Sequence, residues 1–175
     1  VALAVNAKIS NPATCNSIET ILVHQECANR VMPELLAALF DGRVEVRGCE
    51  RTCGYSSACA MATEEDWSAE YLDLIVSIKI VDTFNEALEH ISRYSSGLTD
   101  AICTENKERA AMFLKTVDSA SVLVNASNRL TDGGQFGLGA ELGISTSRIH
   151  MRGPMGLEDL TCTSYIVVGN GHIRS

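Results

Sequence analysis

The stretch at residues 74–81 is the sequence feature that most constrains the fold of this chain. It reads Leu-Ile-Val-Ser-Ile-Lys-Ile-Val, a largely apolar run that is rich in β-branched residues. Such a run predicts a strand buried on both faces, which is the environment of a central strand in a parallel sheet. Parallel strands are joined by crossover connections, usually helices, so strands and helices should alternate along the chain.

The flanking sequence has this alternation. Shorter apolar runs predict strands at residues 21–24, 44–46, 101–104 and 121–125. Helical spacing and capping signals predict helices at residues 1–9, 26–40, 84–94 and 106–117, whereas residues 48–65 are irregular. The inward residues should be Val31, Leu35, Leu36, Leu39 and Phe40 in the second helix, and Ala110, Phe113, Leu114 and Val117 in the fourth. The predicted fold class is α/β, with a mainly parallel sheet and flanking helices.

The end of the chain departs from this alternation. A Gly-rich segment occupies residues 131–146, and residues 165–168 then predict a strand, followed by a turn and a second extended piece at 172–174. A terminal β piece outside the α/β pattern needs a pairing partner, either another subunit or a segment outside this sequence. We therefore expect a homo-oligomer, a dimer or a tetramer.

Charge and cysteine content restrict the partners and the compartment. The formal net charge of −8 argues against nucleic acid and against an anionic membrane surface as partners, and no apolar run is long enough to span a bilayer. Seven cysteines are an odd number, which excludes a complete disulfide framework. A reducing compartment, such as the cytoplasm, is the expected location. The sequence also lacks a starting Met, so we expect it to be cut from something longer, or processed.

Cys15 is the main candidate for chemistry. It lies in a polar turn of small residues, Asn-Pro-Ala-Thr-Cys-Asn-Ser at 11–17, directly before an apolar run. Such a turn leaves a thiol accessible, and its backbone amides could stabilise an oxyanion, so Cys15 is a candidate covalent nucleophile. A plain structural cysteine is the alternative reading.

The other thiols and histidines give weaker signals. Cys49, Cys53 and Cys59 lack the short Cys-x2-Cys spacing of zinc sites and have no nearby histidine, so we expect no metal site. His24 lies close to Cys15 in sequence, but a strand after the turn would point it away as often as toward the thiol. The segment at 131–141 has four glycines in seven residues, which suits either a close approach to a ligand or a plain connection, and it is not a phosphate loop.

Motifs spread over the whole chain carry a resemblance to a known family. They lie at residues 6–8, 12–16, 19–24, 70–74, 118–120, 124–127, 129, 131–134, 136–141, 143–146 and 152–157. On these motifs the sequence resembles the gamma-glutamyl phosphate reductases of proline biosynthesis, within the aldehyde dehydrogenase superfamily. The resemblance implies a catalytic domain at residues 1–156 and a β segment for oligomerisation at 157–175. The N-terminal cofactor-binding domain of the family would be missing, so we expect the chain to be inactive by itself.

The resemblance also implies a reaction and its residues. L-Glutamate 5-phosphate would be reduced with NADPH to L-glutamate 5-semialdehyde through a thioester on Cys15, whose backbone amide would form half of the oxyanion hole. Glu70 would bind the nicotinamide ribose, and Arg129 the α-carboxylate of the substrate unless it is a plain surface arginine. The remaining substrate-binding residues would be Asn16, Ser127, Phe136 and Gly137.

Three alternatives remain open on the sequence. The chain could be a non-catalytic assembly fragment of that enzyme, or part of another acylating aldehyde dehydrogenase. The reductase also occurs fused behind a glutamate kinase, in which case a mitochondrial location replaces the cytoplasm.

Overall fold

A four-stranded parallel sheet forms the centre of the computed structural model, which describes residues 1–175. Its strand order is β1 (Thr20–His24), β4 (Ile75–Val81), β2 (Glu45–Gly48) and β3 (Ala60–Met61). β4 pairs with β1, with Thr20 opposite Ser77, and on its other side with β2, with Glu45 opposite Ile75. The prediction that residues 74–81 form a central parallel strand is therefore confirmed.

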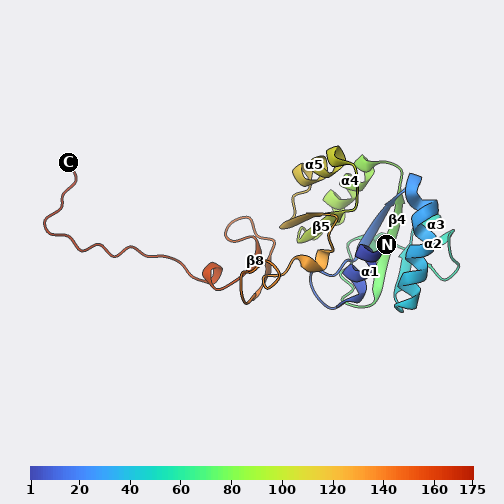
Figure 1. Cartoon of the computed structure of the whole chain (residues 1–175), viewed down its shortest axis with the longest axis horizontal. Coiled ribbons are helices and arrows are strands. Elements are labelled where there is room, and N and C mark those ends of the chain that lie inside the picture. Colours follow the sequence, from blue (N-terminus) through green and yellow to red (C-terminus); the bar gives the residue numbers. More distant parts are fainter.

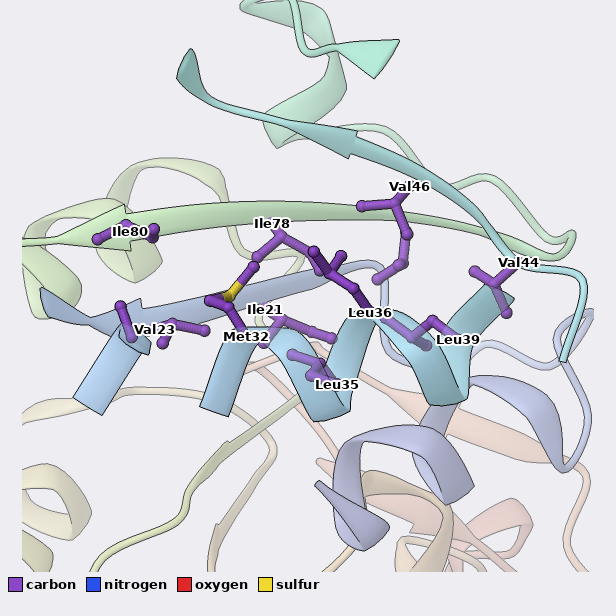
Figure 2. Close-up of a cluster of buried hydrophobic side chains, with 12 residues drawn as sticks. Ile21, Val23, Met32, Leu35, Leu36, Leu39, Val44, Val46, Ile78 and Ile80 are labelled. Atoms are coloured by element: carbon purple, nitrogen blue, oxygen red, sulfur yellow. The ribbon is translucent and has the colours of Figure 1, made fainter. Parts of the chain in front are cut away.

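The long helix α2 (Gln25–Asp41) covers one face of this sheet and supplies five of the twelve core residues, more than any other element. Its side chains Met32, Leu35, Leu36 and Leu39 point at the apolar side chains of β1, β2 and β4 (Figure 2). Each fully buried side chain of this kind contributes roughly 1.5–3 kcal/mol. All five predicted inward residues of this helix pack on the core, although Val31 and Phe40 are only partly buried. Ala28 and Met32 are further core residues that the sequence did not single out.

Two further parallel strands form a separate small sheet. β5 (Thr99–Ile102) pairs with β6 (Ser121–Val124), with Thr99 opposite Ser121. α4 (Phe84–Tyr94) leads from the central sheet into β5, and α5 (Lys107–Thr116) connects β5 to β6 (Figure 1). In α5, Phe113 is buried as expected, but Leu114 is 51% exposed, because the next position along the helix turns toward solvent.

The region predicted to be irregular contains short elements. They are α3 (Glu50–Cys53), β3 and the 3-10 turn η1 (Glu65–Trp67). Elements of four residues or fewer carry too little periodicity for a pattern to show. Thr52 of α3 is fully buried and donates to the carbonyl of Ile78 at 3.0 Å, which fixes α3 against β4.

The C-terminal part begins with the 3-10 turn η2 (Asn128–Leu130) and an antiparallel pair, β7 (Gly143–Ser145) and β8 (Gly153–Met155), that the sequence did not indicate. After the turn η3 (Glu158–Leu160) the chain runs away from the domain (Figure 1). The strand predicted at residues 165–168 is absent within this chain, because those residues have no neighbouring strand to pair with. No helix combines the length and the apolar character that crossing a bilayer requires.

Candidate active site

The turn that carries Cys15 lies between α1 (Ala2–Ile9) and β1. The hydroxyl of Thr14 donates to the carbonyl of Asn11 at 2.9 Å, and the amide of Ser17 donates to the carbonyl of Thr14 at 2.9 Å. Cys15 is exposed, whereas Asn16 and Ser17 after it are buried. The backbone N–H groups of Cys15 and Asn16 donate to no acceptor in the chain. The turn therefore presents an accessible thiol beside two free backbone donors.

Helix α1 holds this turn from one side. Ser17 donates through its hydroxyl to the carbonyl of Ala7 at 3.3 Å, and the amide of Ile18 donates to the same carbonyl at 3.0 Å. Lys8 is fully buried, and its ammonium lies 2.7 Å from a carboxylate oxygen of Glu19. Burial raises the pKa of the Glu19 carboxyl, against the opposing effect of Lys8.

The turn η2 holds the Cys15 turn from the other side. Asn16 is 3% exposed, donates through Nδ2 to the carbonyl of Thr131 at 2.7 Å, and accepts at Oδ1 a hydrogen bond from Arg129 Nη1. Ser127 caps η2 by accepting from the amide of Arg129 at 3.3 Å. The structure thus brings Cys15, Asn16, Ser127 and Arg129 together, although more than 110 residues separate the two segments.

Arg129 is half-buried, and only part of its hydrogen-bond donor capacity is used within the chain. The contact with Asn16 is its one side-chain hydrogen bond, and its Nε is buried without a partner. Nη2 makes no hydrogen bond within the chain either, so this guanidinium has donor capacity left for an anionic ligand.

Phe136 and Gly137 lie in a loop that closes on itself. Asp132 accepts from the amides of Gly134 and Gln135 at 2.9 and 3.2 Å, and Glu141 accepts from the amide of Gly133 at 2.7 Å. Gly137 has a φ of +75°, which favours glycine, and Phe136 is 48% exposed. No hydrogen bond joins these two residues to the Cys15 turn. Glu141, which organises the loop, was not singled out from the sequence.

Glu70 is exposed and makes no hydrogen bond, but the segment that carries it is firmly held. Asp66 accepts from Arg47 at 2.8 Å, from the amide of Thr63 at 2.7 Å and from the hydroxyl of Tyr71 at 2.7 Å. Although burial opposes it, these donors lower the pKa of Asp66 to about 2. The segment is linked to β4, because the hydroxyl of Tyr71 lies 2.7 Å from that of Ser77, and the amide of Ser77 donates to the carbonyl of Glu19 at 2.9 Å.

His24 and the cysteines at 49, 53 and 59 lie elsewhere. His24 ends β1 and accepts from the amide of Glu26 at 3.3 Å, so it caps α2 at the far end of the strand, roughly 13 Å along β1 from Thr20. Cys53 contacts the carbonyls of Gly48 and Ala60, both at 3.4 Å. The hydroxyl of Thr52 and nearby amides lower the pKa of Cys49, although burial opposes them. No group of three or more metal-binding side chains is present.

The chain was compared with protein-family models and with curated proteins. No protein-family model matches the chain. Gamma-glutamyl phosphate reductases from Caldanaerobacter subterraneus and Halothermothrix orenii are both 54% identical to it, over 98% and 97% of its length. The chain spans about two fifths of the length of these curated relatives, 42% and 40% respectively. Over nearly all of its length the chain is thus homologous to part of the gamma-glutamyl phosphate reductases.

Solved structures also resemble the chain. The crystal structure of gamma-glutamyl phosphate reductase from Thermotoga maritima matches the whole chain with a TM-score of 0.92 at 49% identity, and the match covers 42% of that protein. An acetylating aldehyde dehydrogenase from Geobacillus thermoglucosidasius matches 99% of the chain and 48% of its own length, with a TM-score of 0.66 at 15% identity. The second match concerns the fold alone, and it confirms the predicted α/β class.

Proposed function

We propose that this chain is the nucleophile-bearing part of a gamma-glutamyl phosphate reductase. The complete enzyme would reduce L-glutamate 5-phosphate with NADPH to L-glutamate 5-semialdehyde and phosphate. The observation that carries the proposal is the meeting of the exposed Cys15 with the partly unpaired Arg129 through Asn16. The similarity to reductases along the chain supports it.

Cys15 would perform the covalent step. Its thiolate attacks the acyl carbon of the acyl phosphate, the C–S bond forms, and the C–O bond to phosphate breaks, so phosphate leaves with the electron pair. The free N–H groups of Cys15 and Asn16 are available to the oxygen that becomes negative in this step. The product of the step is a thioester that holds the acyl carbon in place.

Arg129 would bind the α-carboxylate of the substrate. A guanidinium with an unpaired N–H group suits a carboxylate, because charge-assisted hydrogen bonds are about twice as strong as neutral ones. Ser127 supports this arrangement by capping η2. Phe136 and Gly137 would cover the substrate from their loop.

Glu70 would contribute to holding NADPH, which when bound supplies the hydride that reduces the thioester. The residue fits this role in one respect, since its carboxylate is exposed, makes no hydrogen bond within the chain and lies on a segment held by Asp66. A carboxylate accepts hydrogen bonds readily from ribose hydroxyl groups. Release of the aldehyde returns Cys15 as a thiolate.

The test replaces single thiols in the complete enzyme that carries this sequence. Cys15→Ala should abolish NADPH-dependent reduction while the far-ultraviolet circular dichroism stays unchanged. Cys103→Ala and Cys162→Ala are matched controls, because these are the other two exposed thiols, and they should retain activity. Reduction by the Cys15→Ala enzyme at the normal rate would show that the nucleophile is elsewhere.

The exposed C-terminal tail supports a second candidate function, that of assembly. Tyr165, Ile166, Val167 and Val168 are 87–95% exposed, and residues of this type are usually buried. We propose that the tail pairs with another subunit, so that the enzyme is a homo-oligomer. If assembly is the only role of this chain, it should self-associate without binding NADPH. Calorimetric titration together with sedimentation of the 175-residue chain would distinguish the two.

A further inference from the structure

Both polar atoms of the Asn16 side chain are engaged within the chain. The oxygen and the NH2 group could each form one further hydrogen bond, but the residue is buried and so is closed to a ligand from solvent. Here Nδ2 donates to the carbonyl of Thr131 at 2.7 Å, the oxygen accepts from Arg129, and the residue is 3% exposed. Its amide therefore joins two segments of the chain, the turn of the nucleophile and the turn η2.

The η2 segment, which Asn16 contacts, is itself held in place by β5. Thr131 is fully buried, and its hydroxyl lies 3.1 Å from the hydroxyl of Thr99 on β5. Asn128 donates through its side chain to the carbonyl of Thr99 at 3.0 Å. Because η2 is held by β5 and the Cys15 turn by α1, Asn16 bridges two fixed supports. The guanidinium of Arg129 is consequently held at a set position relative to Cys15.

We propose that Asn16 is a positioning residue that sets the spacing between the Cys15 thiol and the Arg129 guanidinium, and thereby selects acyl phosphates by the distance between carboxylate and acyl carbon. The inference rests on the proposed function. A substrate whose carboxylate contacts Arg129 presents its acyl carbon to Cys15 only if the connecting carbon chain has the matching length. An analogue shorter by one methylene group, such as an aspartyl phosphate, would then fall short of the thiol.

Loss of the two hydrogen bonds of the Asn16 side chain should have a measurable effect on substrate binding and on substrate discrimination. A hydrogen bond that involves a charged group accounts for a factor of roughly 10–100 in binding. One methylene group accounts for discrimination of roughly 10–200-fold. An arginine that is held in place also loses less side-chain freedom when the ligand binds, which favours the correct substrate further.

The test uses Asn16→Ala in the complete enzyme, with Ser17→Ala as the matched control. Ser17 is buried in the same turn and loses a hydrogen bond to α1 rather than to η2. The Asn16→Ala enzyme should show a KM for the glutamyl substrate raised about tenfold or more, with kcat changed much less. Its preference for the glutamyl over the aspartyl acyl phosphate should fall about tenfold. Ser17→Ala should keep the wild-type preference.

A second measurement separates this inference from the proposed function. In the complete enzyme, amide hydrogen exchange at Leu130 and Thr131, whose amides donate within η2, should be faster in Asn16→Ala than in Ser17→Ala. Faster exchange with an unchanged substrate preference would overturn the positioning role and leave the nucleophile untouched. Equal exchange in the two variants would also overturn it. A failure of the proposed function would appear instead as activity that survives Cys15→Ala.

Discussion

Lys8 and Glu19 form a buried ion pair at the two ends of the segment that carries Cys15. Lys8 Nζ lies 2.7 Å from Glu19 Oε2, and the lysine side chain is fully buried, whereas the glutamate side chain is 19% exposed. Lys8 belongs to the last turn of α1, and Glu19 directly precedes β1. The pair therefore closes the connection between helix and strand, and the turn between them is held at its base.

Replacing Lys8 by Met should destabilise the fold strongly. The variant keeps the length of the side chain but leaves Glu19 without its partner in a mostly buried position, which costs about 3 kcal/mol in the free energy of unfolding. Urea unfolding measures the loss. Lys115→Met is the control, because Lys115 is exposed and has no ion pair, and its effect should stay within about 0.5 kcal/mol. The double variant Lys8→Met/Glu19→Gln should recover part of the loss. Equal losses of stability in Lys8→Met and Lys115→Met would contradict the prediction.

Asp66→Asn should loosen the segment that carries Glu70. The carboxylate accepts from Arg47, Thr63 and Tyr71, and its pKa of about 2 means that it stays charged at neutral pH. The amide keeps the shape but removes the charge and places donors opposite the donors of Arg47. We expect a loss of about 2 kcal/mol in the free energy of unfolding, compared with little change for Glu34→Gln on the exposed side of α2. A loss no larger than that of Glu34→Gln would argue against Asp66 as the anchor.

Local sequence patterns predicted the central part of the fold well. The apolar run at 74–81 is long enough to specify a strand buried on both faces, and Thr83 caps α4 at the predicted start of that helix. Asn106, predicted as the first residue of its helix, is the cap that precedes α5. The division of the parallel strands between two sheets was not predictable, because it depends on pairing between distant segments. β7 and β8 have three residues each, with Gly and Pro among them, and show no strand pattern.

The candidate site was only partly accessible from the sequence. The polar turn around Cys15 indicates exposure, but nothing local predicts that Asn16 contacts Arg129, since the two are 113 positions apart in the sequence. Only the family resemblance placed both in one site. The burial of Lys8 was not predictable from the sequence either, because a lysine in the last turn of a helix is usually exposed and complements the helix dipole. Its burial follows from the position of Glu19 after the turn.

The tail should drive self-association. Ile166 and Val168 alternate along an exposed extended segment, so both project from the same face if the segment pairs as a strand. We expect the chain to form dimers or larger species in sedimentation velocity, and the double variant Ile166→Lys/Val168→Lys to remain monomeric, because charge on that face opposes pairing. Lysines at Ala37 and Ala111, which are exposed positions on α2 and α5, serve as the control for added charge. A monomeric wild-type chain would contradict the prediction.

His90 of α4 lies in an apolar and aromatic environment that disfavours its charged form. It is 6% exposed, its ring packs edge-on against Trp67 and at a tilt against Tyr94, and both of its nitrogens lack hydrogen-bond partners. Burial lowers the pKa of His90 to about 4, and the charge of Lys79 acts in the same direction. Glu86 and Glu64 act in the opposite direction, and Arg93 adds to the lowering.

The stability of the chain should therefore fall on acidification below about pH 6.5. In the unfolded chain His90 takes up a proton near its ordinary pKa of about 6.5, whereas the folded chain does so only near 4. The unfolded state thus binds more protons between these values, and up to about 3 kcal/mol is lost as the pH falls from 6.5 to 4. Urea unfolding at pH 7.5, 6.5, 5.5 and 4.5 measures the slope. His90→Phe keeps an aromatic ring at this position and should flatten the slope, whereas His172→Phe, in the exposed tail, should leave it unchanged. An identical slope in wild type and His90→Phe would assign the acid sensitivity to other groups.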